Sequence, residues 1–122
     1  MAQKTNIIQD KSYAFSIRIV KLYQYLTKTK KEKVLAVQIL RSGTSVGANV
    51  EEAIGAFSIK EFNSKMGISY KEARETKYWL RLLRDTGYIE SKPAESMLAD
   101  CEELLKIMGS ILKTGRQNKA SN

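Results

Sequence analysis

The feature that most constrains the fold is a helical spacing of small and apolar residues that recurs in four separate segments. In the third segment these residues follow one another at steps of four and three: Phe62, Met66, Ser69, Ala73, Thr76, Leu80 and Leu83. Residues spaced in this way share one face of an α-helix, which repeats every 3.6 residues. Because no stretch shows the alternation of a half-buried β-strand, the chain is predicted to be all-α.

Local signals locate several helix ends. Ser58 and Glu61 have the spacing of a capping box. In this motif the serine side chain accepts from the backbone amide of the glutamate, and the glutamate side chain reaches back to the backbone amide at the start of the turn. Phe57 and Phe62 flank this box at the positions of a hydrophobic staple, and Phe57 would also continue the apolar seam of the preceding helix. Gly87 predicts a stop for the third helix, because glycine readily adopts the left-handed conformation that ends helices.

These signals and the polar stretches between apolar segments set the expected boundaries. We predict helices over residues 11–27, 33–56, 59–86 and 92–114, followed by a disordered polar tail over residues 116–122. The connections are short, which favours antiparallel packing of consecutive helices. The sequence therefore predicts a single domain, residues 1–122, folded as an antiparallel up-down-up-down four-helix bundle.

Charge is distributed unevenly along the chain. The formal net charge is +8, and basic residues concentrate in residues 1–33 and 58–86. This asymmetry favours an anionic partner, with nucleic acid ahead of a membrane surface, although lysine-rich surfaces can also serve only to keep a protein in solution. No apolar stretch has the length of a membrane span, and no signal-peptide pattern occurs. We expect a cytoplasmic protein with no membrane partner.

The sequence contains few residues suited to catalysis or metal binding. Histidine is absent, and so are a phosphate-binding loop, a dinucleotide fingerprint and a cysteine pair. Cys101 lies on the predicted apolar seam of the last helix and is expected to be buried. Glu51, Glu52, Glu72 and Glu75 remain as acid–base candidates, with Glu52 and Glu72 as the central pair, but salt bridges explain them more simply. We predict a non-enzymatic protein without cofactor or metal.

The run over residues 41–53 is unusual for a bundle helix, because it places two glycines, Gly43 and Gly47, inside an otherwise apolar segment. Each glycine costs the helix about 1 kcal/mol relative to alanine, so a packing or binding role is expected. Polar residues of this run share a stripe, and a comparable stripe follows on the third helix. We predict that both form a polar network between helices or between subunits, with ligand binding as the alternative: Arg41, Ser45, Asn49, Glu52, Ser69 and Glu72.

A second group of residues suits nucleic acid better. A basic stripe recurs along the third helix at steps of three and four: Lys71, Arg74, Lys77, Arg81 and Arg84. Such cations neutralise phosphates, and the neighbouring rings of Tyr70, Tyr78 and Trp79 could stack on unpaired bases. The alternative is a solvated outer face whose rings pack between helices. Spacing alone does not separate the two interpretations.

Residues 17–89 resemble a bacterial family of four-helix bundle proteins whose founding members are encoded by intervening sequences within 23S ribosomal RNA genes. The matching segments lie at residues 38–42, 45–53, 61–62 and 69–73. Ala53 departs from the pattern, since many members end the motif of the second helix with Glu-Gly, and we expect only local packing to change. The resemblance implies an antiparallel bundle, often assembled as a homopentamer with a central channel. Related accessory proteins of diversity-generating retroelements form similar basic barrels that bind nucleic acid and a reverse transcriptase.

Together, the residues and the resemblance predict a self-associating four-helix bundle that binds RNA or DNA through its basic surface. The expected partners are further copies of the chain, a nucleic acid and a protein such as a reverse transcriptase. The alternative is a protein-interaction scaffold that binds no nucleic acid, whose basic residues only keep it in solution or meet an acidic partner.

Overall fold

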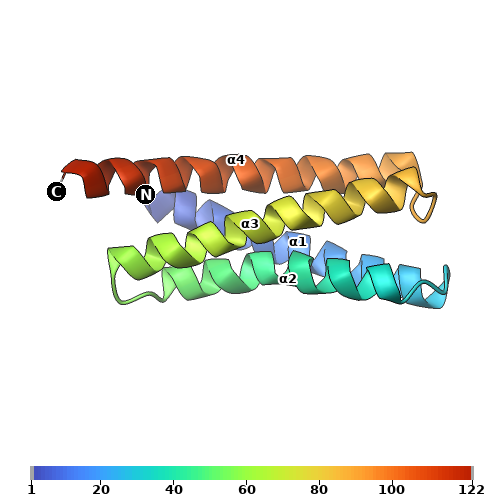
Figure 1. The fold of residues 1–122 in the computed structure, drawn as a ribbon. Coiled ribbons are helices and arrows are strands. Elements are labelled where there is room, and N and C mark those ends of the chain that lie inside the picture. The colour runs from blue at the N-terminus through green and yellow to red at the C-terminus, as the bar shows by residue number, and fades with distance from the viewer. Residues whose placement is uncertain (1, 122) are drawn as a thin grey trace.

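The computed structural model describes residues 2–121, and it describes the side chains of residues 3–115. Within this part the chain forms four helices and no strand: α1 (Ala2–Lys28), α2 (Val34–Ile54), α3 (Ile59–Asp85) and α4 (Ser91–Ser121). Consecutive helices run antiparallel and lie side by side, and both chain ends lie at the same end of the bundle (Figure 1). The predicted all-α four-helix bundle is confirmed.

The helices bury the residues that the periodic pattern selects. Every residue of the third-segment pattern from Met66 to Leu83 is buried, including the polar Ser69 and Thr76. Each helix packs against its neighbours in chain order, and α4 closes the ring against α1. The α1–α4 seam is the most open, and an apolar hollow of about 390 Å³ forms there beside Leu22, Tyr25 and Met97. None of the described helices has the length and hydropathy of a membrane span.

The first helix is longer than predicted. It starts at Ala2, nine residues before the expected start, because Ile8 and Ser12 extend the buried stripe that continues through Phe15 and Ile19. Ile8 is completely buried, and Ser12 is 1% exposed while its hydroxyl donates to the carbonyl of Gln9. The sequence concealed this extension, because Ile7 and Ile8 are adjacent rather than at helical spacing and the other residues around them are polar.

The last helix also differs from the prediction. It continues to Ser121, whereas we expected a disordered tail from residue 116, and residue 122 lies outside the described part. Gly115 does not end the helix. A Cβ there would lie 2.4 Å from Oδ1 of Asn63, so glycine serves a close approach of α4 to the start of α3. The sequence does not display this close approach of Gly115 to Asn63.

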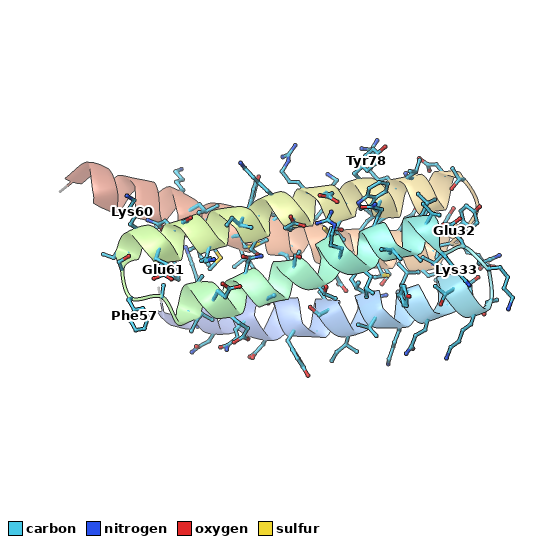
Figure 2. The ribbon with its side chains drawn as sticks, turned by 60° about the horizontal axis from the view of Figure 1, so that its bottom comes forward. Glu32, Lys33, Phe57, Lys60, Glu61 and Tyr78 are labelled. Atoms are coloured by element: carbon cyan, nitrogen blue, oxygen red, sulfur yellow. The ribbon has the colours of Figure 1, made fainter. Side chains whose placement is uncertain are left out.

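The turn between α2 and α3 contains one confirmed signal and one wrong one. The amide of Glu61 donates to Ser58 Oγ at 3.0 Å, so Ser58 caps α3 as predicted. The Glu61 carboxylate also reaches back, but it accepts from the amide of Phe57 at 3.0 Å, one residue before the amide that a standard capping box uses. The hydrophobic staple does not form, because α2 ends at Ile54 and Phe57 is fully exposed at the end of the bundle (Figure 2). The buried seam of α2 ends at Ala53 and does not continue to Phe57.

The other two turns use left-handed residues. Gly87 has φ +84° and ends α3, as predicted. Lys31 has φ 57° between α1 and α2, and this conformation lets the amide of Glu32 donate to the carbonyl of Leu26 at 2.9 Å. The Glu32 carboxylate then accepts from the amide of Leu35 at 2.6 Å, which satisfies a free amide at the start of α2. Glu32 therefore links the end of α1 to the start of α2.

Candidate functional site

The glycine-containing run of α2 has two faces with different partners. Its glycines face α1. A Cβ at Gly43 would lie 2.7–2.8 Å from three side-chain atoms of Ile19, and a Cβ at Gly47 would lie 2.9 Å from Ser16 Oγ and 3.3 Å from the carbonyl oxygen of Ser12. Any larger residue would push the two helices apart, so these glycines set the close approach of α1 and α2.

A neighbouring face of the run is joined to α3 by buried hydroxyl groups. Ser69 Oγ donates to the carbonyl of Val46 at 2.7 Å, and Thr76 Oγ1 donates to Ser42 Oγ at 2.9 Å. Ser42, Ser69 and Thr76 are all completely buried. Buried polar groups are stable only when they are hydrogen-bonded, so these contacts fix the register of α2 against α3.

The six residues of the predicted polar network separate into three groups: three charged residues in ion pairs, two residues bonded within α2, and one buried serine. Arg41 forms an ion pair with Glu72 at 3.2 Å and a second one with Glu75, at the rim of the α2–α3 interface. Glu52 pairs with Lys65 at 3.1 Å, also between α2 and α3.

The other predicted members behave differently. Asn49 Nδ2 donates to the carbonyl of Ser45 at 2.9 Å, so these two residues bond within α2 rather than across to α3. Ser69 is buried, as described above, and bonds to the backbone of α2. Sequence analysis missed Ser42 as a member, although it precedes the predicted Gly43 seam by one position and lies one turn before Ser45.

The acid–base candidates do not form an open catalytic pair. Glu52 and Glu72 are paired with Lys65 and Arg41, which is the arrangement expected of structural carboxylates. Glu51 accepts from Nε2 of Gln9 at 3.2 Å. No group of three or more potential metal ligands occurs among the described residues.

Cys101 is buried between α3 and α4. Its thiol donates to the carbonyl of Ala73 at 3.2 Å. Burial, with a smaller contribution from the charge of Glu102, raises the pKa of the Cys101 thiol to about 12. The neutral thiol is therefore the only form present near neutral pH, as expected of a cysteine that packs in a core.

The predicted basic stripe lies on α3, but its members differ in how free their charges are. Lys71, Arg74 and Arg81 are exposed. Lys77 forms an ion pair with Glu102 of α4, and the hydrogen bond from Lys77 lowers the pKa of the Glu102 carboxyl.

Arg84 is the fifth member of the stripe, and it also has a carboxylate partner. Its Nε donates to Asp85 at 2.8 Å, and this hydrogen bond lowers the pKa of the Asp85 carboxyl. Within the described residues no carboxylate lies within ion-pair distance of Arg74 or Arg81. Between residues 74 and 81, these two guanidinium groups are therefore the cations most available to an anionic ligand.

A polar hollow of about 280 Å³ lies beside these two arginines, between α3 and α4. Its lining consists of Arg74, Lys77, Tyr78 and Arg81 from α3 and Leu105 from α4. Three cationic side chains and one aromatic ring thus surround one small depression. A depression of this composition can accept an anion, because positive charge converges on it from one helix face.

The three aromatic side chains near the stripe have different environments. Tyr70 is half-buried, and a Cβ at Gly109 of α4 would lie 3.8 Å from its ring. Trp79 is half-buried and its Nε1 donates to Glu75 at 2.9 Å. Tyr78 is 54% exposed, and its ring contacts Trp79 edge-on at a centroid distance of 5.0 Å. Two rings therefore pack between helices, whereas Tyr78 remains open to a ligand.

Comparison with known proteins gives matches of two kinds, one to a family model and one to solved structures. A family model described as 23S rRNA-intervening sequence protein matches residues 4–110. A crystal structure of a protein with unknown function from the S23 ribosomal protein family, from Bacteroides thetaiotaomicron, is similar with a TM-score of 0.89 and 49% sequence identity. The match covers 90% of this chain and 98% of that chain. No curated protein matches.

Proposed function

This chain belongs to the 23S rRNA-intervening sequence protein family, and we propose that it is a non-enzymatic, self-associating protein that binds RNA or DNA through α3. The observation that carries the proposal is the pair Arg74 and Arg81, which are exposed beside a polar hollow and form no ion pair in the described part of the chain. The net charge of +8 adds long-range attraction for a polyanion. The cytoplasm, where RNA is abundant, is the proposed compartment.

The arginine pair indicates where on α3 a phosphate would bind, which net charge alone does not. Lys77 and Arg84 lie on the same face, but their charges are partly compensated by Glu102 and Asp85. Binding of a phosphate to either would have to displace a carboxylate from direct contact. Arg74 and Arg81 form no such ion pair, and their charges only contribute from a longer distance to the lowered pKa of Glu102 and of Asp85. We therefore assign the main phosphate contacts to these two arginines, with Lys71 as a further exposed cation on the same helix.

A salt series tests nucleic-acid binding. Affinity for structured RNA and for duplex DNA should fall linearly with the logarithm of salt concentration, because phosphate contacts release counterions. The double variant Arg74→Gln/Arg81→Gln should reduce that slope by about two, since each phosphate contact contributes about one.

The matched control is Lys60→Gln/Lys113→Gln. It removes the same net charge from exposed residues of α3 and α4 outside the stripe, and it should leave the slope nearly unchanged. Absence of binding at low salt would contradict the proposal, and so would an equal loss in both double variants.

Self-association is supported by an apolar stripe on the outside of α1. Tyr13, Ile17 and Val20 are 67%, 44% and 40% exposed, at the spacing of one helix face, and line a hollow of about 370 Å³. The bundle core does not use these side chains, and exposed apolar clusters of this kind mark contact surfaces. A further copy of the chain is the proposed partner, with five copies as the assembly that the family resemblance predicts.

Solution mass measured by sedimentation at several concentrations tests the assembly. Ile17→Glu should shift the mass toward the monomer, because a charge in an apolar interface must be desolvated. Ile68→Glu on α3 is the matched control, since Ile68 is 41% exposed and lies away from the α1 stripe. A monomeric wild-type chain at all concentrations would remove self-association from the proposal.

A protein-interaction scaffold is the second candidate, and the α2–α3 turn favours it. Phe57 is fully exposed and Ile59 is 67% exposed at that end of the bundle (Figure 2). Together they offer an apolar contact for a protein partner. A relation to the accessory proteins of diversity-generating retroelements, with a reverse transcriptase as partner, stays a prediction of this second candidate. Nucleic-acid binding that depends on Arg74 and Arg81 would separate the two functions.

A further inference from the structure

The hollow on α3 combines positive charge with an exposed aromatic ring. This combination bears on whether the site suits single-stranded or duplex nucleic acid. Arg74 and Arg81 are seven residues apart on one helix, which places them two turns and roughly 10 Å apart along its axis. Tyr78 lies between them in the chain and lines the same hollow. The cations therefore flank an aromatic surface rather than form a uniform charged strip.

Tyr78 is held in place by its neighbour. Its ring meets that of Trp79 at an interplanar angle of 71°, and Trp79 is fixed in turn by the hydrogen bond from Nε1 to Glu75. Glu75 is itself paired with Arg41 of α2. A side chain supported in this way loses little conformational entropy when a ligand stacks on it. The free energy of stacking is therefore more favourable. Figure 2 shows Tyr78 at the surface of α3.

The apolar side of the hollow also favours a nucleotide base as ligand over a phosphate alone. Leu105 of α4 forms the wall opposite the α3 residues, and it offers no hydrogen bond to a phosphate. A site for phosphate alone would gain nothing from a leucine and an aromatic ring. A base can use both, because its flat face is apolar and polarisable, while its phosphates can reach the arginines.

We infer that this hollow binds an unpaired nucleotide, with the base stacked on Tyr78 beside Leu105 and the flanking phosphates bound by Arg74 and Arg81. Bases within a duplex are stacked on each other and cannot offer a face to a side chain, so single-stranded RNA or DNA is the ligand that fits. A duplex engages only the cations. The inference rests on the proposed nucleic-acid binding and adds the strandedness of the ligand.

The chain carries its own reporter for this contact. Trp79 is the single tryptophan, and its ring centroid lies 5.0 Å from that of Tyr78. The probes are single-stranded polyuridylate, single-stranded polythymidylate, and a duplex RNA and a duplex DNA of equal length. Both single strands should change the fluorescence of Trp79 on binding, and the duplexes should bind without that change.

Variants of Tyr78 give the decisive comparison. Tyr78→Ala should lower the affinity for the single strands roughly 5- to 150-fold, the range expected for loss of one base–aromatic stack, and should leave duplex affinity unchanged. Tyr78→Phe keeps the ring and should keep the affinity. Tyr25→Ala is the control, because Tyr25 is an exposed tyrosine of α1 outside this hollow. Thermal unfolding of each variant checks that the bundle is intact.

The outcomes separate this inference from the function on which it rests. If Tyr78→Ala weakens single strands and duplexes equally, or weakens neither, the inference is overturned while salt-dependent binding through Arg74 and Arg81 still stands. If no probe binds at low salt, the proposed function and the inference both fall. A preference for polyuridylate over polythymidylate would identify RNA as the source of the unpaired nucleotide.

Discussion

Thr76 of α3 donates a hydrogen bond to Ser42 of α2 at 2.9 Å, between two side chains that are completely buried. Thr76 Oγ1 also lies 2.8 Å from the carbonyl oxygen of Glu72 within its own helix. Its single proton can serve only one of these acceptors at a time, and the Ser42 hydroxyl can donate the second hydrogen bond. The pair therefore links the two helices at a point from which water is excluded.

Removing one member of this pair should be worse than removing both. Thr76→Val keeps the shape of the side chain but leaves the Ser42 hydroxyl buried without its partner, which should lower the free energy of unfolding by about 1–3 kcal/mol. The double variant Ser42→Ala/Thr76→Val removes both hydroxyls and should be more stable than Thr76→Val alone. Urea unfolding of the three proteins measures this order, and a double variant less stable than Thr76→Val would contradict it.

Alanine at Gly43 should destabilise the bundle even though alanine is the better helix former. The added Cβ would lie 2.7–2.8 Å from side-chain atoms of Ile19, which is fully buried and has a β-branched, stiff side chain. Overpacking of this kind costs about 1–3 kcal/mol, so after the gain in helix propensity of about 1 kcal/mol we expect a net loss of up to about 2 kcal/mol. Thermal and urea unfolding measure the net loss.

Gly67 provides the matched control for this prediction. It lies inside α3, and a Cβ there would meet no atom within 4 Å. Gly67→Ala should therefore raise the free energy of unfolding by about 0.5–1 kcal/mol through helix propensity alone. If both alanine variants were stabilised, Gly43 would have no packing role, and the close approach of α1 and α2 would need another cause.

The chain's periodic spacing predicts which residues face the core, because a 3.6-residue period is a property of each helix by itself. It does not reveal which helix faces a given residue. Thus the unusual glycines could be located in the sequence, but their contact with Ile19 and Ser16 of α1 could not. The start of α1 was missed for a related reason, since the adjacent pair Ile7 and Ile8 shows no helical spacing by itself, and only packing reveals that Ile8 is the buried one.

The candidate site shows the same limit. The spacing of Arg74, Lys77 and Arg81 on one face was evident from the sequence, but the pairing of Lys77 with Glu102 depends on how α4 packs against α3. The exposure of Tyr78 likewise depends on packing, because spacing placed Tyr78 and Trp79 near the same stripe, and only the structure separates the open ring from the half-buried one.

Cys101 should lose its protection only at strongly alkaline pH. Burial raises the pKa of its thiol from an ordinary 9.0 to about 12, so the folded chain keeps the proton where the unfolded chain releases it. Between pH 9 and 12 the free energy of unfolding should therefore fall relative to that of Cys101→Ala, by at most about 1.4 kcal/mol per pH unit. Below pH 9 the difference between the two proteins should be constant. A constant difference up to pH 12 would show that the thiol is solvated.

Removing the carboxylate of Glu102 should tighten the binding of nucleic acid at the hollow on α3. Glu102 pairs with Lys77, so Glu102→Gln frees the third cation that lines this hollow and also removes a repelling charge. Glu103→Gln is the matched control, because it makes the same change of net charge one residue away, where Glu103 pairs with Lys11 of α1 at 3.1 Å. We expect about one additional phosphate contact in the salt slope for Glu102→Gln and none for Glu103→Gln. Equal effects of the two variants would mean that net charge alone attracts the nucleic acid, and that the hollow has no special part in binding it.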